Sequence, residues 1–171
     1  MTPPVWLPPA LSFGGHWETF IETVYQVFEQ DFKHSRPSFR GLAVHHDSRI
    51  EDGREVGFWH IVQRDDATAG ERVPDLKRCE RIPWPKPTID HSTDSTVSVW
   101  ENERKTSRHY GLQKRVLIWL EEADYLVVMT AKEKFMILVT AFRVDDDSYK
   151  EKLRNERDEF YKKQKPPQGA T

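Results

Sequence analysis

Residues 115–142 read RVLIWLEEADYLVVMTAKEKFMILVTAF and contain three apolar runs rich in β-branched and aromatic residues. The runs are Val116–Leu120, Tyr125–Thr130 and Phe135–Phe142. The polar links between them are Glu121–Asp124 and Ala131–Lys134. Links this short join antiparallel neighbours, because a parallel crossover needs about a dozen residues or more. The alternating segment Thr96–Trp100 adds a strand, so the sequence predicts a four-stranded antiparallel sheet in the C-terminal half.

Helices are predicted on both sides of this sheet in the sequence. Apolar residues recur at steps of three and four between Trp17 and Phe28, which predicts an amphipathic helix that ends before Pro37. The charged segment Tyr149–Lys163 predicts a closing helix. The strands are apolar on both faces, so we expect helices or a partner to cover both. The fold class is therefore α+β, with helices before and after the sheet.

The chain is expected to form one soluble domain, residues 13–163, because 171 residues with 37 % hydrophobic content supply a single core. Residues 1–12 contain four prolines, which predicts an extended arm. Residues 164–171 are expected to be a disordered tail.

The segments between the first helix and the sheet are less regular. Three elements are predicted here: a strand at Gly41–His46, a polar loop at Asp65–Pro74 and a short helix at Asp75–Arg81, with Asp75 as its N-cap. Pro83, Pro85 and Pro87 predict an extended path after that helix. The segment EVGFWHIVQ, residues 55–63, fits either a strand or a short helix, because periodicity does not separate the two over so short a run.

Charge and cysteine content restrict the class of protein. Lys and Arg number 26 and Asp and Glu number 28, so nucleic acid would have to bind at a local basic cluster. One cysteine, Cys79, rules out an internal disulfide and zinc sites with several thiolates. No apolar run approaches the roughly 18 residues that span a bilayer, and the N-terminus lacks the basic residues of a signal peptide. These features predict a cytoplasmic protein without membrane association.

Histidines provide the candidates for proton transfer. His45 and His46 are adjacent, and neighbours on a strand point to opposite faces, so we expect no metal site here. His60 lies between Trp59 and Ile61 and has two interpretations. It is either a core or cleft-edge histidine bonded to backbone, or a general acid–base group, since imidazole titrates near neutrality. No motif in the sequence indicates a cofactor.

Basic residues gather on the predicted strands and on the loop between Arg104 and Gly111, and two more, Arg78 and Arg81, border Cys79. The candidates for contact with an RNA backbone are Arg78, Arg81, Arg108, Lys114, Arg115 and Arg143, and the candidates for stacking on bases are Trp100, His109 and Tyr110. Aromatic rings stack on bases while cations hold the phosphates, so this interleaving indicates a nucleic-acid groove. The alternative is an ordinary solvated edge, since charged side chains protect exposed strands.

From Val97 to Lys163 the order of elements resembles the Barnase–EndoU–colicin–RelE-like nuclease group, and above all its phage and mobile-element branches. The resemblance lies in the strand sequences KRVLIWLEEADYLVVM and FMILVTAFRV, in the step Thr140-Ala141-Phe142 and in the charged helix KEKLRNERDEFYKK. In that group, one or two helices precede a four-stranded antiparallel sheet. The likeness is looser over the first half of the chain.

This resemblance implies a metal-independent endoribonuclease, a toxin or phage-linked effector, in which the ribose 2′-hydroxyl attacks the adjacent phosphorus. The reaction needs a base, an acid and a group that stabilises the phosphate. His60 or His46 would transfer the proton, and Thr140 would donate a hydrogen bond. Lys114, Arg115 and Arg143 would hold the phosphate. The implied partners are RNA and an antitoxin or inhibitor protein.

The second hypothesis is a non-catalytic module of the same fold that binds RNA or a protein. The net charge of −2 favours it, because many ribosome-directed RNases of this fold are strongly basic. Incubation with RNA in EDTA, followed by analysis of the fragment ends, separates the two hypotheses.

Overall fold

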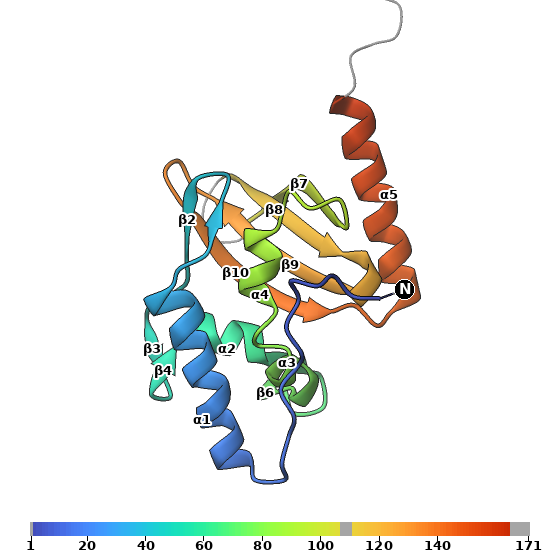
Figure 1. The fold of residues 1–171 in the computed structure, drawn as a ribbon. Helices are drawn as coiled ribbons and strands as arrows, with labels where there is room; N and C mark the ends of the chain where they lie inside the picture. Colours follow the sequence, from blue (N-terminus) through green and yellow to red (C-terminus); the bar gives the residue numbers. More distant parts are fainter. Residues whose placement is uncertain (1, 107–110, 165–171) are drawn as a thin grey trace, which may run out of the picture.

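The computed structural model describes residues 2–106 and 111–164, which form a six-stranded mixed sheet with helices on both faces (Figure 1). The strand order is β1-β2-β10-β9-β8-β7. The strands are β1 (Ser38–Phe39), β2 (Leu42–His45), β7 (Val97–Lys105), β8 (Leu112–Leu120), β9 (Tyr125–Ala131) and β10 (Met136–Arg143). Two short hairpins lie outside this sheet: β3 (Ile50–Glu51) with β4 (Arg54–Glu55), and β5 (Gln63–Asp66) with β6 (Glu71–Pro74).

The prediction of a four-stranded antiparallel sheet is wrong. Strands β7 to β10 pair antiparallel in sequence order, but β2 also pairs with β10, and in parallel. Val44 lies opposite Met136 and His45 opposite Ile137. β1 then pairs antiparallel with β2. The length of a link reveals pairing only between neighbours in the chain, and β2 lies far from β10 in the sequence.

The helices are α1 (Trp17–Phe28), its π-helical continuation η1 (Glu29–His34), α2 (Val56–Val62), α3 (Leu76–Glu80), α4 (Pro85–Asp90), the 3₁₀ turn η2 (Glu121–Ala123) and α5 (Asp147–Gln164). The two terminal helices are confirmed, and the ambiguous segment EVGFWHIVQ contains α2, with Glu55 in β4 and Gln63 in β5 at its two ends. Gln164, expected in the tail, belongs to α5, and the rest of that tail lies outside the described residues. None of the helices in residues 2–106 and 111–164 is long and apolar enough to cross a membrane.

The segment Asp65–Pro74, expected to be a loop, contains most of the β5–β6 hairpin. Asp66 closes its turn, because its carboxylate accepts hydrogen bonds from the backbone N–H groups of Thr68 at 2.9 Å and Ala69 at 3.3 Å. Gly70 follows with a positive φ of 67°, a conformation that glycine adopts without strain. A short polar turn of this kind resembles a loop when only composition is considered.

The path through Pro85 and Pro87, expected to be extended, is the first turn of α4. Proline is tolerated there because the N–H groups of a first turn have no partner within the helix. The N-cap of α3 is confirmed, since the carboxylate of Asp75 accepts a hydrogen bond from the backbone N–H of Arg78 at 3.0 Å.

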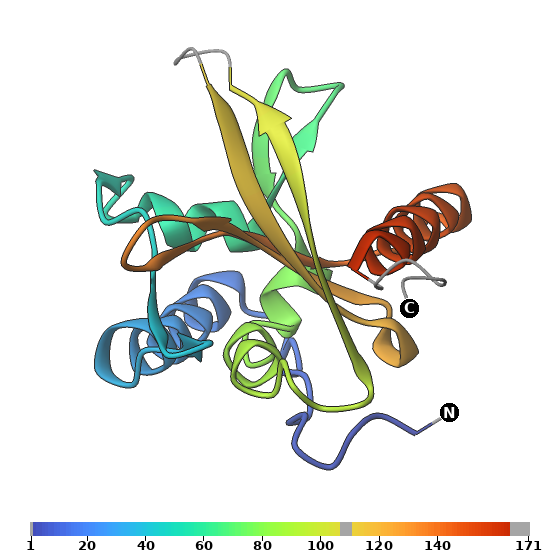
Figure 2. The same cartoon turned by 90° about the horizontal axis from the view of Figure 1, so that it is seen from above.

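Each face of the sheet carries its own apolar core. Helices α1 and α4 lie over one face and α5 lies on the opposite side (Figure 2). Helices α2 and α3 pack against β10 and contribute Phe58 and Cys79 to the same core as α1 and α4. The main core, formed with α1 to α4, includes Phe28, Phe58, Ile89, Ile118 and Leu138. The second core, under α5, includes Trp100, Leu117, Trp119, Val128 and Leu153. Helical cover on both sides agrees with the apolar pattern of the strands.

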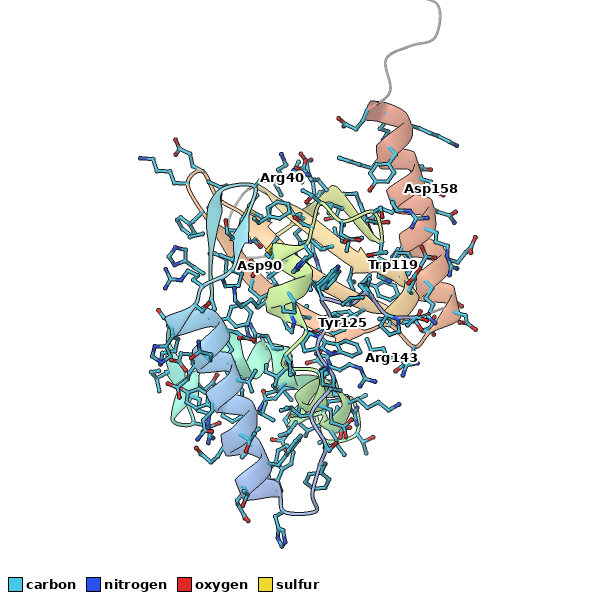
Figure 3. All side chains as sticks on the ribbon, viewed as in Figure 1. Arg40, Asp90, Trp119, Tyr125, Arg143 and Asp158 are labelled. Atoms are coloured by element: carbon cyan, nitrogen blue, oxygen red, sulfur yellow. The ribbon has the colours of Figure 1, made fainter. Side chains whose placement is uncertain are left out.

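The charged helix α5 is held on the sheet by cation–aromatic contacts. The guanidinium groups of Arg154 and Arg157 lie 5.7 and 5.6 Å from the ring of Trp119, between the sheet and α5 (Figure 3). The same arginines pair with Glu121, at 2.7 and 2.8 Å. Arginine stems and planar head groups therefore add to the thin apolar stripe of this helix.

The N-terminal arm has no helix or strand in residues 2–12, but it packs against the domain. The ring of Trp6 stacks on that of His91 at 4.5 Å. Trp84 Nε1 donates a hydrogen bond to the Pro8 carbonyl at 2.8 Å, and the Leu11 N–H donates to the Glu80 carbonyl at 2.7 Å. The arm, which makes one turn where the Leu7 N–H donates to the Pro4 carbonyl at 3.0 Å, therefore covers part of the core.

Helix α2 approaches the segment after β2 closely at Gly57, and this contact yields a stability prediction. A Cβ atom at Gly57 would lie 2.8 Å from His46 Cβ and 3.0 Å from the Asp47 backbone nitrogen. We expect Gly57→Ala to lower the free energy of unfolding, measured in urea, by about 1–3 kcal/mol, because the backbones must separate. At Gly14 nothing lies within 4 Å, so Gly14→Ala is the matched control with little effect. Equal stability of the two variants would contradict this close approach.

Candidate functional site

A cavity of about 330 Å³ on the side of the sheet that carries α5 collects residues from seven elements: α2, β5, β6, α3, β7, β8 and β10. We call it the arginine pocket. Its lining consists of Arg64, Arg72, Arg78, Arg104 and Arg115, together with His60, Asp65, Val139, Thr140 and Phe142. The β5–β6 hairpin and the far ends of β7 and β8 extend in the same direction in Figure 2. Five arginines face one carboxylate in this lining, so the pocket is strongly cationic.

A β-bulge in β10 turns Thr140 toward the arginine pocket. Leu138 pairs with Met129 and Thr140 with Val128, so Val139 is an extra residue without a partner of its own. Leu138 lies in the main core, and regular alternation would place Thr140 on that same face. The extra residue reverses the alternation beyond it, as bulges near functional sites commonly do.

Thr140 also ties β10 to helix α2. Its hydroxyl donates a hydrogen bond to the backbone carbonyl of His60 at 3.1 Å. This bond fixes the C-terminal end of α2 against β10. Strand β5 begins three residues after His60, at Gln63. The position of His60 and of the hairpin that follows is therefore set by the bulged strand.

The carbonyl of Gln63 organises two of the arginines. It accepts hydrogen bonds from Arg78 Nη1 at 2.6 Å and from Arg72 Nη2 at 3.0 Å. The guanidinium of Arg78, from α3, also lies 4.9 Å from the ring centre of Phe142 on β10. Stacking and the carbonyl bond orient this guanidinium without neutralising its charge.

The positive charge of the pocket is only partly balanced. Arg64 pairs with Asp75 at 3.2 Å, and Arg72 lies 3.7 Å from Asp65. Arg78, Arg104 and Arg115 form no ion pair with any carboxylate in residues 2–106 and 111–164. Burial lowers the pKa of both Arg78 and Arg115 from the ordinary value of an arginine. Partly buried cations without counter-charges are costly, so the pocket is suited to an anionic ligand.

His60 is half-buried at the edge of the pocket. Burial, and then the positive charge of Arg72, lower the pKa of its imidazole from the ordinary 6.5, while the carboxylate of Asp47 opposes them. The imidazole is therefore mostly neutral at pH 7, and a neutral imidazole can accept a proton.

Four candidates from the sequence thus lie together in the arginine pocket: His60, Arg78, Arg115 and Thr140. Lys114 and Arg143 do not line it. Lys114 Nζ pairs with Glu101 at 3.1 Å, and Arg143 Nε pairs with Asp145 at 3.1 Å near the end of β10 (Figure 3).

Three further candidates have other surroundings. Trp100 is fully buried under α5 and donates a hydrogen bond to Glu156 at 2.7 Å, so its ring is not open to a base. The imidazole of His46 packs edge-on against Phe28, 5.0 Å away in the main core. Arg81 lies over the ring of Trp84 at 5.2 Å. Arg108, His109 and Tyr110 lie outside the described residues.

The sequence did not single out Arg64, Asp65 and Arg72 as candidates, although all three line the pocket. They belong to the hairpin that was expected to be a loop. The available signal was the segment QRDDATAGERVP, in which polar residues with arginine on both sides flank a turn with Asp66 and Gly70. A hairpin interpretation would have placed both arginines on paired strands beside His60.

Within the part of the chain that the structure describes, no group of three or more His, Cys, Asp or Glu side chains is arranged to hold a metal ion. Comparison with protein-family models, with curated proteins and with solved structures found no match to this chain. A functional interpretation therefore depends on the chemistry of the arginine pocket.

Proposed function

We propose that this protein is a metal-independent endoribonuclease-like domain that binds an RNA phosphate in the arginine pocket. The observation that supports the proposal is the convergence of His60, Thr140, Arg78 and Arg115 on one cavity, where three guanidinium groups have no ion-pair partner among the described residues. Guanidinium matches the geometry of phosphate oxygens and can bind them bidentately. The nuclease resemblance and the cytoplasmic location inferred from the sequence are part of this proposal.

The chemistry requires three actions at the phosphate. His60 accepts the proton of the ribose 2′-hydroxyl, whose oxygen bonds to phosphorus as the bond from phosphorus to the 5′-oxygen breaks. The leaving 5′-oxygen takes a proton from the imidazolium or from water. Arg78 and Arg115 stabilise the negative charge on the pentacoordinate phosphate. The products are a 2′,3′-cyclic phosphate and a free 5′-hydroxyl.

The second candidate function is a non-catalytic RNA- or protein-binding module. One observation favours it: His60 is the single imidazole in the described lining, and the hydroxyl proton of Thr140 is already donated to the His60 carbonyl. The described lining thus supplies anion binding more fully than proton transfer. An inhibitor or antitoxin protein would be a partner under the first hypothesis.

Binding is tested with labelled single-stranded RNA and the variants Arg104→Ala and Arg115→Ala. We expect each variant to bind more weakly and to reduce the slope of log affinity against log salt concentration by about 0.7, the value for one lost phosphate contact on single strands. Arg40→Ala is the matched control, because Arg40 pairs with Glu101 outside the pocket. An unchanged slope in both pocket variants would assign these arginines to an ordinary solvated surface.

Catalysis is tested by incubating the protein with RNA in EDTA and identifying the fragment ends. Cyclic phosphate and 5′-hydroxyl ends are the expected result. Binding that depends on Arg115 without any cleavage would favour the non-catalytic candidate.

A further inference from the structure

A second cavity, of about 390 Å³, adjoins the arginine pocket and shares Arg104 and Arg115 with it. We call it the Tyr149 cavity. It lies between α5 and strands β7, β8 and β9, and its other lining residues are Asn102, Glu103, Leu117, Val128, Tyr149, Lys152, Leu153 and Glu156. A ligand whose phosphate sits among the arginines would therefore extend its neighbouring group toward this cavity.

The floor of the Tyr149 cavity is apolar and one wall is aromatic. Leu117, Val128 and Leu153 are 5 %, 6 % and 3 % exposed, so they form a rigid base within the second core. Tyr149, in the first turn of α5, is half-buried and lines the cavity. Proteins that bind unpaired RNA place bases on such apolar and aromatic surfaces.

The polar rim of this cavity carries acceptor groups. Glu156 Oε1 accepts hydrogen bonds from Trp100 Nε1 at 2.7 Å and from Asn102 Nδ2 at 2.9 Å. These bonds anchor the carboxylate, and its Oε2 has no hydrogen bond to any described residue. The second carboxylate, Glu103, is exposed at the same rim. Lys152 adds a cation to the lining, as do the shared Arg104 and Arg115. Ionised carboxylates only accept hydrogen bonds, so the part of the rim formed by Glu103 and Glu156 favours a ligand edge with donors.

We infer that the Tyr149 cavity binds the nucleobase next to the bound phosphate and selects bases with an exocyclic amino group over uracil. This inference rests on the proposed function and adds to it a preference among the bases of the RNA. The amino groups of cytosine, adenine and guanine donate to a carboxylate, whereas uracil flanks its single N–H with two carbonyl oxygens. Those oxygens would face the carboxylates of Glu103 and Glu156 unfavourably.

The test uses nucleoside 3′-monophosphates that differ by one amino-to-carbonyl exchange, with binding to the full chain measured by calorimetry. Cytidine 3′-monophosphate is expected to bind about tenfold more tightly than uridine 3′-monophosphate, and the adenosine form more tightly than the inosine form. Tyr149→Ala should weaken all of them by about 5- to 150-fold, the range for one lost stacking contact, while Tyr149→Phe retains binding.

Glu156→Gln isolates the origin of the selectivity. The amide keeps the size of the side chain and an oxygen for Trp100, but it presents donors in place of Oε2. The preference for cytidine over uridine 3′-monophosphate should therefore fall, with circular dichroism to verify the fold.

The outcomes separate this inference from the proposed function. Equal binding of the cytidine and uridine forms, or an unchanged affinity in Tyr149→Ala, would overturn the base site even if RNA still binds through Arg115. Failure of both RNA and all four monophosphates to bind would overturn the inference together with the proposed function.

Discussion

His60→Gln is expected to lower kcat/KM for RNA cleavage by about 10²–10⁴-fold, the range that general acid–base catalysis contributes. Glutamine approximates the size of imidazole but cannot accept a proton at neutral pH. The carbonyl of His60, which receives the Thr140 hydroxyl, is backbone and stays in place. We therefore expect RNA affinity and thermal stability to change little, and rates of cleavage in EDTA provide the measurement.

The pH dependence of cleavage by the wild-type protein is a second test of His60 as the proton acceptor. Burial and Arg72 lower the pKa of His60 below 6.5, so the neutral, proton-accepting form predominates above that pH. kcat/KM should rise with pH through an apparent pKa below 6.5 and then level off. His60→Gln should lose this rise together with the activity.

His45→Gln is the matched control for this prediction. Burial also lowers the pKa of His45, but its imidazole packs against Phe135, 5.1 Å away, and does not line the arginine pocket. Its rate should equal that of the wild type. Full cleavage activity in a folded His60→Gln variant would remove His60 from the mechanism and favour the non-catalytic candidate.

Glu55→Ala is expected to lower the free energy of unfolding by about 3 kcal/mol, because it leaves two polar groups without their shared acceptor. Glu55 is only 5 % exposed. Its carboxylate accepts hydrogen bonds from the hydroxyl of Tyr25 at 2.6 Å and from Lys33 Nζ at 2.8 Å. This contact joins α1 and η1 to the start of α2. Unfolding in urea provides the measurement.

The contribution of Glu55 should depend on pH in a defined direction. Burial opposes ionisation of Glu55, but the hydrogen bonds from Lys33 and Tyr25 outweigh it, so the pKa lies below the ordinary 4.5. A carboxyl with a lowered pKa in the folded state stabilises the protein above 4.5, and that stabilisation is lost as the pH falls through the folded-state pKa. The difference between wild type and Glu55→Gln should shrink accordingly in acid.

Glu29→Ala is the control that removes a carboxylate paired with Lys33 at an exposed position. Glu29 also pairs with Lys33, at 3.3 Å, but both side chains are about a third exposed, and such pairs contribute about 0.5 kcal/mol or less. A loss in Glu55→Ala no larger than in Glu29→Ala would show that burial of Glu55 adds nothing.

The strands β8, β9 and β10 are predictable from the sequence because each is a contiguous apolar run between polar turns. The pairing of β2 with β10 is not, since the four residues of β2 carry no information about a partner so distant in the chain. Helix α4 was missed for a different reason. Proline is disfavoured in the interior of a helix but is accepted in its first turn, and composition alone does not tell which of these positions a proline occupies.

The kinds of side chain at the candidate site were easier to predict from the sequence than the individual residues that line it. Imidazole, guanidinium and hydroxyl groups make His60, Arg115 and Thr140 candidates by their chemistry, and the fold brings them to one cavity. The indole ring makes Trp100 a candidate for stacking on a base. Whether a strand residue is exposed, however, depends on the register of its strand and on which helix covers that face of the sheet. That face is the one packed under α5, where the ring is buried.

The bulge at Val139, more than the composition of β10, decides which side chains of this strand face the arginine pocket. Substitutions at Thr140 or Phe142 alter one contact of the arginine pocket at a time. A regular strand of the same length would instead exchange the two faces beyond Leu138, turning Thr140 toward the main core and Ala141 away from it. Deletion of Val139 would leave both side chains on their present faces, because Leu138 and Thr140 would then be neighbours on the strand. Core and pocket are therefore coupled through one backbone irregularity.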